Sequence, residues 1–240
     1  MADGYERWLL AKGGVFMPSA AAVVALVEKL RKERWLPEAP GRAWRTVDNE
    51  FGDDVKARIR ASTEPVPAAL TADWLEDPRR EELRLVWDVT GDAARYPLSA
   101  APPGPGDAAF AIELHRSAEY VYPLADGIDP LPTECACGED LGFQWDEDEV
   151  VPAFRSSGGI FAECDACSRT FDPSKRSAAI ASPFGGGAEQ VMGGAAYRFA
   201  LKVDCGERFV RDTGLAFARE LVVLVESEFG RDFHEVGALY

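Results

Sequence analysis

The chain of 240 residues is long enough to bury a substantial core, and 47% hydrophobic with 28% charged residues is ordinary composition for a folded protein. Its 41 acidic and 26 basic residues give a formal net charge of −15 at pH 7. A negative field of this size repels phosphate backbones and anionic lipid. We therefore expect no nucleic-acid binding and no membrane binding, and a basic protein is the kind of partner that fits. The sequence gives no indication of oligomeric state.

The beginning of the chain predicts a cytoplasmic protein. Met1–Lys12 is charged and holds only one short apolar run, unlike a secretory signal. The apolar stretch Ala20–Val27 is too short to span a bilayer. In the cytoplasm thiols stay reduced, which favours metal binding over disulfides for a cysteine cluster.

The first half of the chain predicts two strands and a helix around a stretch without clear pattern. Tyr5–Phe16 is typical of a strand and a turn, and Ser19 is placed to cap a helix that ends before Pro37. Up to residue 80 the only further element expected is a short helix at Ala68–Leu75. Glu82–Val89 alternates polar and apolar residues, which predicts a half-exposed strand.

The next part predicts two strands joined by a turn. Ser99–Asp107 is rich in proline and glycine and is expected to be a surface loop. Strands are expected at Ala108–Arg116 and Tyr120–Leu124, with the turn at Ser117–Glu119. The glycine-rich stretch Ser182–Ala195 lacks the lysine and hydroxyl residue of a phosphate loop, so a flexible loop is expected there.

The end of the chain predicts a strand, a helix and a last strand. The strand is Tyr197–Val203, with Tyr197 and every second residue after it on one face. Asp212 or Thr213 is placed to cap a helix that ends before Gly230, and Phe233–Leu239 closes the chain as a strand. The order of elements predicts a single α+β domain over residues 1–240, with two amphipathic helices on one mixed sheet.

The cysteines carry the strongest chemical signal in the sequence. Four of the five form a C-x-C-G and a C-x-x-C separated by 26 residues: Cys135, Cys137, Cys164 and Cys167. Four thiolates supply the ligands of a tetrahedral Zn²⁺, and a set with all four positions filled indicates a structural site, because catalytic zinc keeps one position open. Iron in the same cage, disulfides and free thiols are the alternatives.

The two pairs resemble the knuckles of zinc-ribbon (rubredoxin-like) modules, because Gly138 follows the first pair and a short strand follows the second. The resemblance covers residues 135–167 and implies a structural metal in a ribbon inserted at about 133–173, without naming an activity. Leu141–Trp145 and Gly159–Ala162 are expected to form the hairpin arms. The C-x-C spacing is shorter than usual in such modules, and His115 is an alternative ligand to Cys135.

An acidic run accompanies the first cysteine pair. Seven acidic residues and no basic one lie between Glu134 and Glu149. One interpretation is a solvated tip of the ribbon, since charge runs are commonly solvated. The other is a docking surface for a basic protein, with an aromatic anchor in the middle of the acids. The candidate partner-binding residues are Trp145, Asp146, Glu147, Asp148 and Glu149.

We therefore expect a non-enzymatic, acidic protein that binds or inhibits a basic partner, for example as an immunity- or antitoxin-like protein covering a cationic nuclease. The first alternative is an enzyme with a site near His115 or Cys205. Cys205 is flanked by Asp204 and Glu207, whose charges raise the pKa of a thiol, so a structural role is expected for it. The second alternative is a nucleic-acid-associated zinc ribbon, against which the net charge argues.

Overall fold

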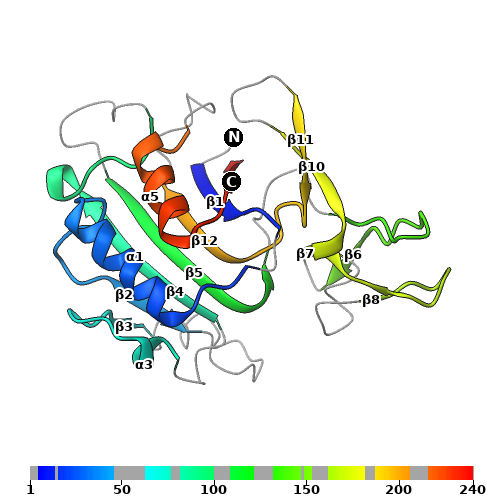
Figure 1. Ribbon diagram of the computed structural model, residues 1–240, viewed down its shortest axis with the longest axis horizontal. Helices are drawn as coiled ribbons and strands as arrows, with labels where there is room; N and C mark the ends of the chain where they lie inside the picture. The colour runs from blue at the N-terminus through cyan, green and yellow to red at the C-terminus, as the bar shows by residue number, and fades with distance from the viewer. Residues whose placement is uncertain are drawn as a thin grey trace.

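A seven-stranded antiparallel sheet forms the centre of the protein, as the computed structural model shows (Figure 1). The structure describes residues 5–13, 16–45, 63–76, 82–99, 109–121, 132–146, 149–152, 162–181, 187–205 and 216–239. The strands follow the order β13-β1-β12-β5-β4-β2-β3, so both ends of the chain lie at one side of the sheet. Their bounds are β1 Tyr5–Ala11, β2 Arg42–Arg45, β3 Glu64–Pro65, β4 Glu82–Thr90, β5 Ala109–Val121, β12 Tyr197–Asp204 and β13 Phe233–Leu239.

Two amphipathic helices cover one face of this sheet, α1 (Ala20–Lys32) and α5 (Arg219–Phe229) (Figure 1). The predicted cap of α1 is confirmed, because the Ser19 hydroxyl accepts a hydrogen bond from the Ala22 N–H at 3.2 Å. Gly230 ends α5 in the left-handed conformation, with φ 59°, also as predicted. Sheet and helices together make an α+β arrangement. The expectation of a mixed sheet is wrong, because all pairs among its described strands are antiparallel.

The core between helices and sheet follows from the alternation along the strands. Every second side chain of β4 points to the helices and is buried, and the same holds for the matching face of β5 and β12. The helices contribute their apolar stripes to the same cluster. Its largest buried members on the strands and helices include Trp87, Leu9, Phe199, Leu26 and Leu221.

The opposite face of the sheet is covered in part by a second hairpin, β10 (Ser177–Ala181) with β11 (Ala188–Met192). Its buried side chains Ile180 and Val191 belong to one apolar cluster with Trp8 of β1. The prediction of a flexible loop over Ser182–Ala195 is therefore wrong for the residues of β11. Val191 has a buried apolar surface to cover, and this tertiary contact outweighs the local preference of the surrounding glycines.

Three further predictions need correction. β5 is one strand from Ala109 to Val121, so the turn expected at Ser117–Glu119 is absent, and only the register with β12 shifts there, from Arg116 opposite Phe199 to Val121 opposite Tyr197. Tyr197 packs on the hairpin side, away from Phe199, because the register of β12 shifts between these two residues. The helix α5 begins only at Arg219, whereas its expected caps lie outside the described residues.

The stretch between α1 and β4 holds more structure than its sequence suggests. β2 pairs with β4, β3 pairs with β2, and the short helix α3 (Ala72–Leu75) begins after Thr71, whose hydroxyl accepts from the Trp74 N–H. The predicted helix at Ala68–Leu75 is thus confirmed in its second half. In the ranges described, no helix has the length and apolar character needed to span a membrane.

His234 of β13 lies buried next to this hairpin-covered face, with 8% of its surface exposed. Among the described residues neither of its ring nitrogens has a hydrogen-bond partner. Burial, followed by the positive charge of Lys12, lowers the pKa of His234 to about 4, although Glu189 acts in the opposite direction. Lys12 and Glu189 themselves form an ion pair of 2.9 Å that joins the end of β1 to β11.

We predict that His234 makes the fold sensitive to acid. In the unfolded chain its pKa returns to about 6.5, so the unfolded state takes up the proton first and stability is lost as pH falls from 6.5 towards 4. The loss is on the order of 3 kcal/mol by pH 4. Urea unfolding at several pH values measures the free energy of unfolding, which should fall more steeply with decreasing pH in the natural protein than in His234→Leu. Equal slopes in the two proteins would contradict the prediction.

Candidate metal centre

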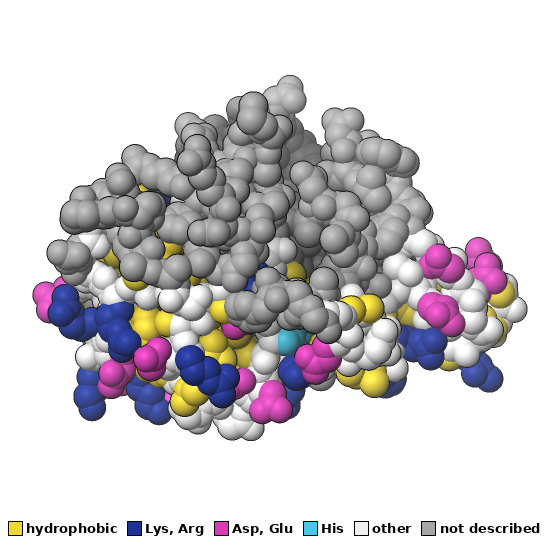
Figure 2. Space-filling model, turned by 90° about the horizontal axis from the view of Figure 1, so that it is seen from above, with side chains coloured by type: hydrophobic (Ala, Val, Ile, Leu, Met, Phe, Trp, Pro, Cys, Tyr) yellow, Lys and Arg dark blue, Asp and Glu magenta, His cyan; other side chains and the backbone are white. Residues whose placement is uncertain are grey.

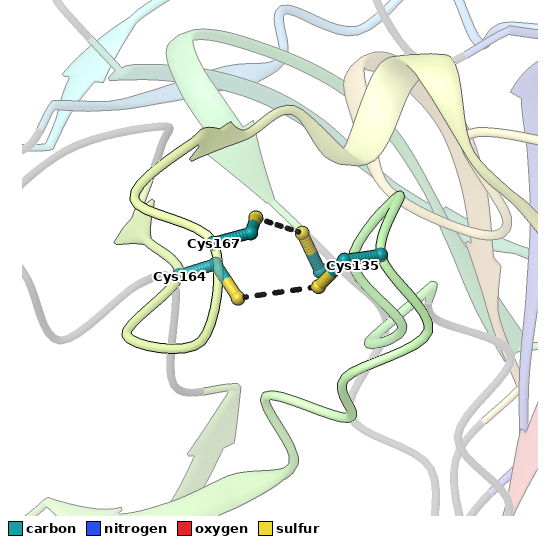
Figure 3. A group of neighbouring side chains, drawn as sticks. Cys135, Cys164 and Cys167 are labelled. Atoms are coloured by element: carbon teal, nitrogen blue, oxygen red, sulfur yellow. Dashed lines mark hydrogen bonds between the residues drawn. The ribbon is translucent and has the colours of Figure 1, made fainter.

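The four cysteine sulfurs form one cluster. All four Sγ atoms lie within 4.8 Å of one another. Two contacts join the pairs, Cys135 to Cys167 and Cys137 to Cys164, each at 3.7 Å (Figure 3). A tetrahedron with metal–sulfur bonds of about 2.3 Å has edges of about 3.8 Å, whereas a disulfide bond measures about 2.05 Å. The cluster therefore fits a tetrahedral metal ion, and it could hold one.

The first pair sits in a tight loop closed by backbone hydrogen bonds. The Cys135 N–H donates to the Glu139 carbonyl at 2.7 Å, and the Gly138 N–H donates to the Cys135 carbonyl at 2.9 Å. Gly138 has φ 92°, a conformation that L side chains rarely adopt. The glycine after the second cysteine thus lets the chain turn back within three residues and present both sulfurs on one side.

The second pair sits in a loop of similar construction. It connects β8 (Ala162–Glu163) to β9 (Thr170–Phe171), which pair with each other. The Cys164 carbonyl accepts hydrogen bonds from the N–H groups of Cys167 at 3.2 Å and Ser168 at 2.7 Å. Ser168, the residue after the second cysteine, has φ 54°, so it occupies the left-handed region that Gly138 occupies in the first loop.

A small apolar cluster closes one side of the site. Cys135 and Cys164 are buried against Phe171, whose ring is 2% exposed, and Leu141 packs beside them. The other side is open, because Cys137 is exposed and Cys167 is partly exposed. The site therefore has one dry side and one side that faces solvent.

Arg176 connects the metal site to the rest of the molecule. Its guanidinium donates to the carbonyl oxygens of Glu134 at 3.0 Å and Cys135 at 3.3 Å. Its own carbonyl accepts from the Gly193 N–H at 2.6 Å, which ties it into the turn after β11. The first cysteine loop is thereby fixed to the hairpin that packs on the central sheet. Its guanidinium also lies 3.8 Å from the Glu134 carboxylate. Nothing in the sequence around Arg176 indicates this role, because its hydrogen bonds to the loop go to backbone carbonyls.

The electrostatics of the sulfurs also favour a cation. The Cys137 N–H donates to the Cys135 sulfur and lowers the pKa of Cys135 to about 7, so one thiolate forms easily. Burial raises the pKa of Cys164, and the neighbouring sulfurs of Cys135 and Cys137 raise it further. A second and third thiolate therefore need a positive ion between them, and metal binding should release protons and weaken in acid.

Asp146 and Glu149 of the acidic run belong to a separate hairpin, β6 (Phe143–Asp146) with β7 (Glu149–Pro152). Asp146 pairs directly with Glu149, and Trp145 pairs with Val150. The described residues do not form the expected hairpin, because β6 pairs with β7 and Ala162 pairs with Phe171, whereas residues 159–161 lie outside the described ranges. Glu147 and Asp148 lie outside the described residues.

Exposed acids surround the cysteine loops as well. Figure 2 shows acidic side chains gathered at the end of the molecule that the cysteine segment forms. Between residues 132 and 176 the described basic residues are fewer, Arg169, Lys175 and Arg176, and Lys175 is paired with Asp172. The exposed acidic residues on the two cysteine loops and their flanking strands are Glu134, Glu139, Asp140, Glu163 and Asp165.

His115 and Cys205 do not come together. His115 is buried, with its Nδ1 2.9 Å from the Tyr197 hydroxyl on the face opposite the helices. Cys205 belongs to the helix-covered core, and burial raises the pKa of its thiol to about 12. The two residues expected near an enzymatic site thus lie on opposite faces of the sheet. The metal cluster contains Cys135 and not His115.

Comparison with protein-family models, with curated proteins and with solved structures finds no match for this chain. The cysteine cluster and the acidic surface beside it are therefore the features from which we argue a function.

We predict opposite effects of substitution at the two left-handed positions. Gly138→Ala should cost about 1 kcal/mol, equivalent to roughly a five- to tenfold loss of metal affinity, because no atom lies within 4 Å of the new Cβ and only the backbone resists it. Ser168→Gly should remove a similar cost and tighten binding. Competition with a chelator measures both affinities.

The control is Gly91→Ala, in the turn after β4. Gly91 has φ 59° and nothing within 4 Å of the Cβ that alanine would add, so its substitution carries the same backbone cost away from the cysteines. It should lower the free energy of unfolding and leave metal affinity unchanged. Equal metal affinity in Gly138→Ala and the natural protein would show that this loop does not take part in binding.

Proposed function

We propose that the protein is a non-enzymatic binding protein in which a structural Zn²⁺ fixes a zinc-ribbon insertion, and that the insertion presents an acidic surface to a basic protein. The observation that carries the proposal is the sulfur geometry, with contacts of 3.7 Å between the pairs. One specific form is an immunity- or antitoxin-like protein that covers the cationic surface of a nuclease.

Zinc is the metal that this ligand set suits best. Zn²⁺ prefers four thiolates in a tetrahedron when its role is structural, and no fifth group is required. Iron also binds four thiolates, and it is the alternative metal for the same cage. The four sulfurs come from two loops closed by their own backbone hydrogen bonds. Because they fill all four positions of a tetrahedral ion, no coordination position is left for a substrate.

The metal has a clear structural task here. The apolar cluster around the cysteines has Phe171 as its only fully buried large side chain among the described residues. One aromatic ring buries too little surface to order two loops and two short strands. Four metal–thiolate bonds supply the missing stabilisation, as they do in small metal-dependent modules generally.

The acidic surface is the part that we propose meets the partner. Four thiolates with one divalent ion add a charge of about −2 to the acids that already surround the loops. Charges held on a metal-fixed loop keep their positions, so a complementary basic surface gains speed and selectivity of association. The same negative field repels nucleic acid. Binding of nucleic acid by the zinc ribbon is therefore less favoured than binding of a basic protein.

We predict one zinc per chain and its loss in Cys164→Ser. The buried Cys164 contributes both a sulfur and the carbonyl that closes the second loop, so the variant should lose the metal and expose amides of residues 132–142 and 162–176 to hydrogen exchange. Elemental analysis and exchange mass spectrometry measure the two effects.

The matched control is Cys205→Ser, which alters the cysteine in the helix-covered core. This variant should keep its zinc and its protection in the cysteine loops, although its global stability should fall. Zinc retained at full stoichiometry in Cys164→Ser would contradict the four-cysteine site, and iron instead of zinc would change the metal while keeping the cage.

We further predict that the acids of the β6–β7 hairpin bind cationic chains. A labelled lysine-rich peptide serves as the probe, and its affinity should fall as salt rises from about 50 to about 200 mM. Neutralising Asp146, Glu147, Asp148 and Glu149 to their amides should weaken binding roughly fivefold without loss of zinc. Fluorescence anisotropy measures the affinity.

A second variant with the same change of net charge separates local from global effects. Its four acids lie outside the cysteine segment and are exposed: Glu28, Glu33, Glu38 and Asp232. Neutralising them should leave peptide affinity nearly unchanged. Equal weakening by both variants would mean that net charge alone attracts the peptide, and the proposed docking surface would then be wrong.

A further inference from the structure

We propose that Cys137 is the site at which hydroperoxides oxidise this protein, and that it then forms a disulfide with Cys164 that releases the metal. This inference depends on the metal site of the proposed function. Oxidation at Cys137 would remove the metal that holds the acidic residues of the cysteine loops in place.

Exposure singles out Cys137. It is the exposed member of the four, whereas Cys135 and Cys164 are 1% and 0% exposed. A peroxide molecule approaching from solvent therefore meets Cys137 before it reaches the buried pair. Attack requires a thiolate, and a metal-ligating cysteine is held in that form.

Distance places a partner for Cys137 on the other loop. The Cys164 sulfur lies 3.7 Å from that of Cys137, on the other loop (Figure 3 shows the two loops facing each other). The remaining two sulfurs, those of Cys135 and Cys167, are likewise 3.7 Å apart. Because each sulfur of the first pair has a sulfur of the other loop at this distance, we expect oxidation to join the two loops to each other.

The chemistry balances with one peroxide for each disulfide. The Cys137 thiolate attacks a peroxide oxygen, the O–O bond breaks, and sulfenic acid and hydroxide form. The Cys164 thiolate then attacks the Cys137 sulfur, the S–O bond breaks, and a second hydroxide leaves. The two sulfurs together lose two electrons to the peroxide, and two protons from solvent convert both hydroxides to water.

Metal loss follows from the ligand count. After the first disulfide only Cys135 and Cys167 remain as thiolates, and two ligands do not hold a structural zinc against a chelator. Oxidation of the second pair leaves the cluster uncharged in place of about −2. The surface around the loops thus becomes less acidic as the loops lose their metal, which should weaken its attraction for a basic partner.

The fifth cysteine provides an internal reference. Cys205 is 3% exposed in the helix-covered core, and burial raises the pKa of its thiol to about 12. A buried thiol with a raised pKa holds little thiolate and reacts slowly. Cys205 should therefore stay reduced while the metal site is oxidised.

The test treats the purified, metal-loaded protein with about one equivalent of hydrogen peroxide, because one disulfide consumes one peroxide. A chromogenic chelator follows metal release, and N-ethylmaleimide then labels the remaining thiols in denaturant. Tryptic cleavage after Arg116, Arg155 and Arg169 leaves the first cysteine pair on the peptide 117–155 and the second pair on 156–169. A disulfide between the loops joins these peptides, whereas one within a pair does not.

We expect the two peptides to be joined, with label on Cys135, Cys167 and Cys205, and the joined peptides to separate on addition of a thiol reductant. Unjoined peptides with internal disulfides would overturn the assigned pairing. Retained metal with five free thiols, or oxidation of Cys205 first, would overturn the inference as a whole. A protein without metal before peroxide is added would instead contradict the proposed function. The Cys205→Ser variant should release its metal as the natural protein does.

Discussion

In the cysteine segment, residues 132–142 and 162–176, the backbone holds four sulfurs close together. The stability of this segment depends on how the mutual repulsion of these sulfurs is relieved. The two loops bring all four Sγ atoms within 4.8 Å, and one of them ionises easily. Each further thiolate then costs more, because burial and the neighbouring sulfurs both oppose the charge. A divalent cation reverses the sign of this cost: the repulsion that would push the loops apart becomes attraction to a common centre. Folding of the segment and metal binding are therefore expected to be one process.

The same segment is attached to the sheet by contacts of a different kind. Arg176 donates to two carbonyl oxygens of the first loop, and the hairpin that follows it buries Ile180 and Val191 on the sheet. These contacts need no metal. Loss of the metal should therefore loosen the loops while the hairpin stays on the sheet. This division explains how a single chain can keep its α+β core and still have a part whose order depends on metal.

The sequence predicted the elements whose signals are local. The stripe of α1, the cap at Ser19, the alternation of β4 and the final glycine of α5 each depend on residues close together in the chain. What it could not show depends on partners far along the chain: the unbroken course of β5, the reversal of Tyr197 and the strand β11. For the site, the spacing of the cysteines indicated the ligands. The sequence could not predict which sulfurs lie close across the loops, nor the role of Arg176, because neither distances nor hydrogen bonds to backbone carbonyls depend on a recognisable residue pattern.

The exposure of Cys137 is the feature that separates this site from an inert structural one. A metal site needs four thiolates, but none of them has to lie at the surface. Cys135 and Cys164 are buried against Phe171, whereas Cys137 is exposed. Both cysteine loops also carry exposed acids, so solvent, oxidant and any basic partner approach the same part of the molecule. A partner bound there would shield Cys137, and an oxidant that reached it first would remove the metal that holds the acids in place. Binding and oxidation would then compete for one surface.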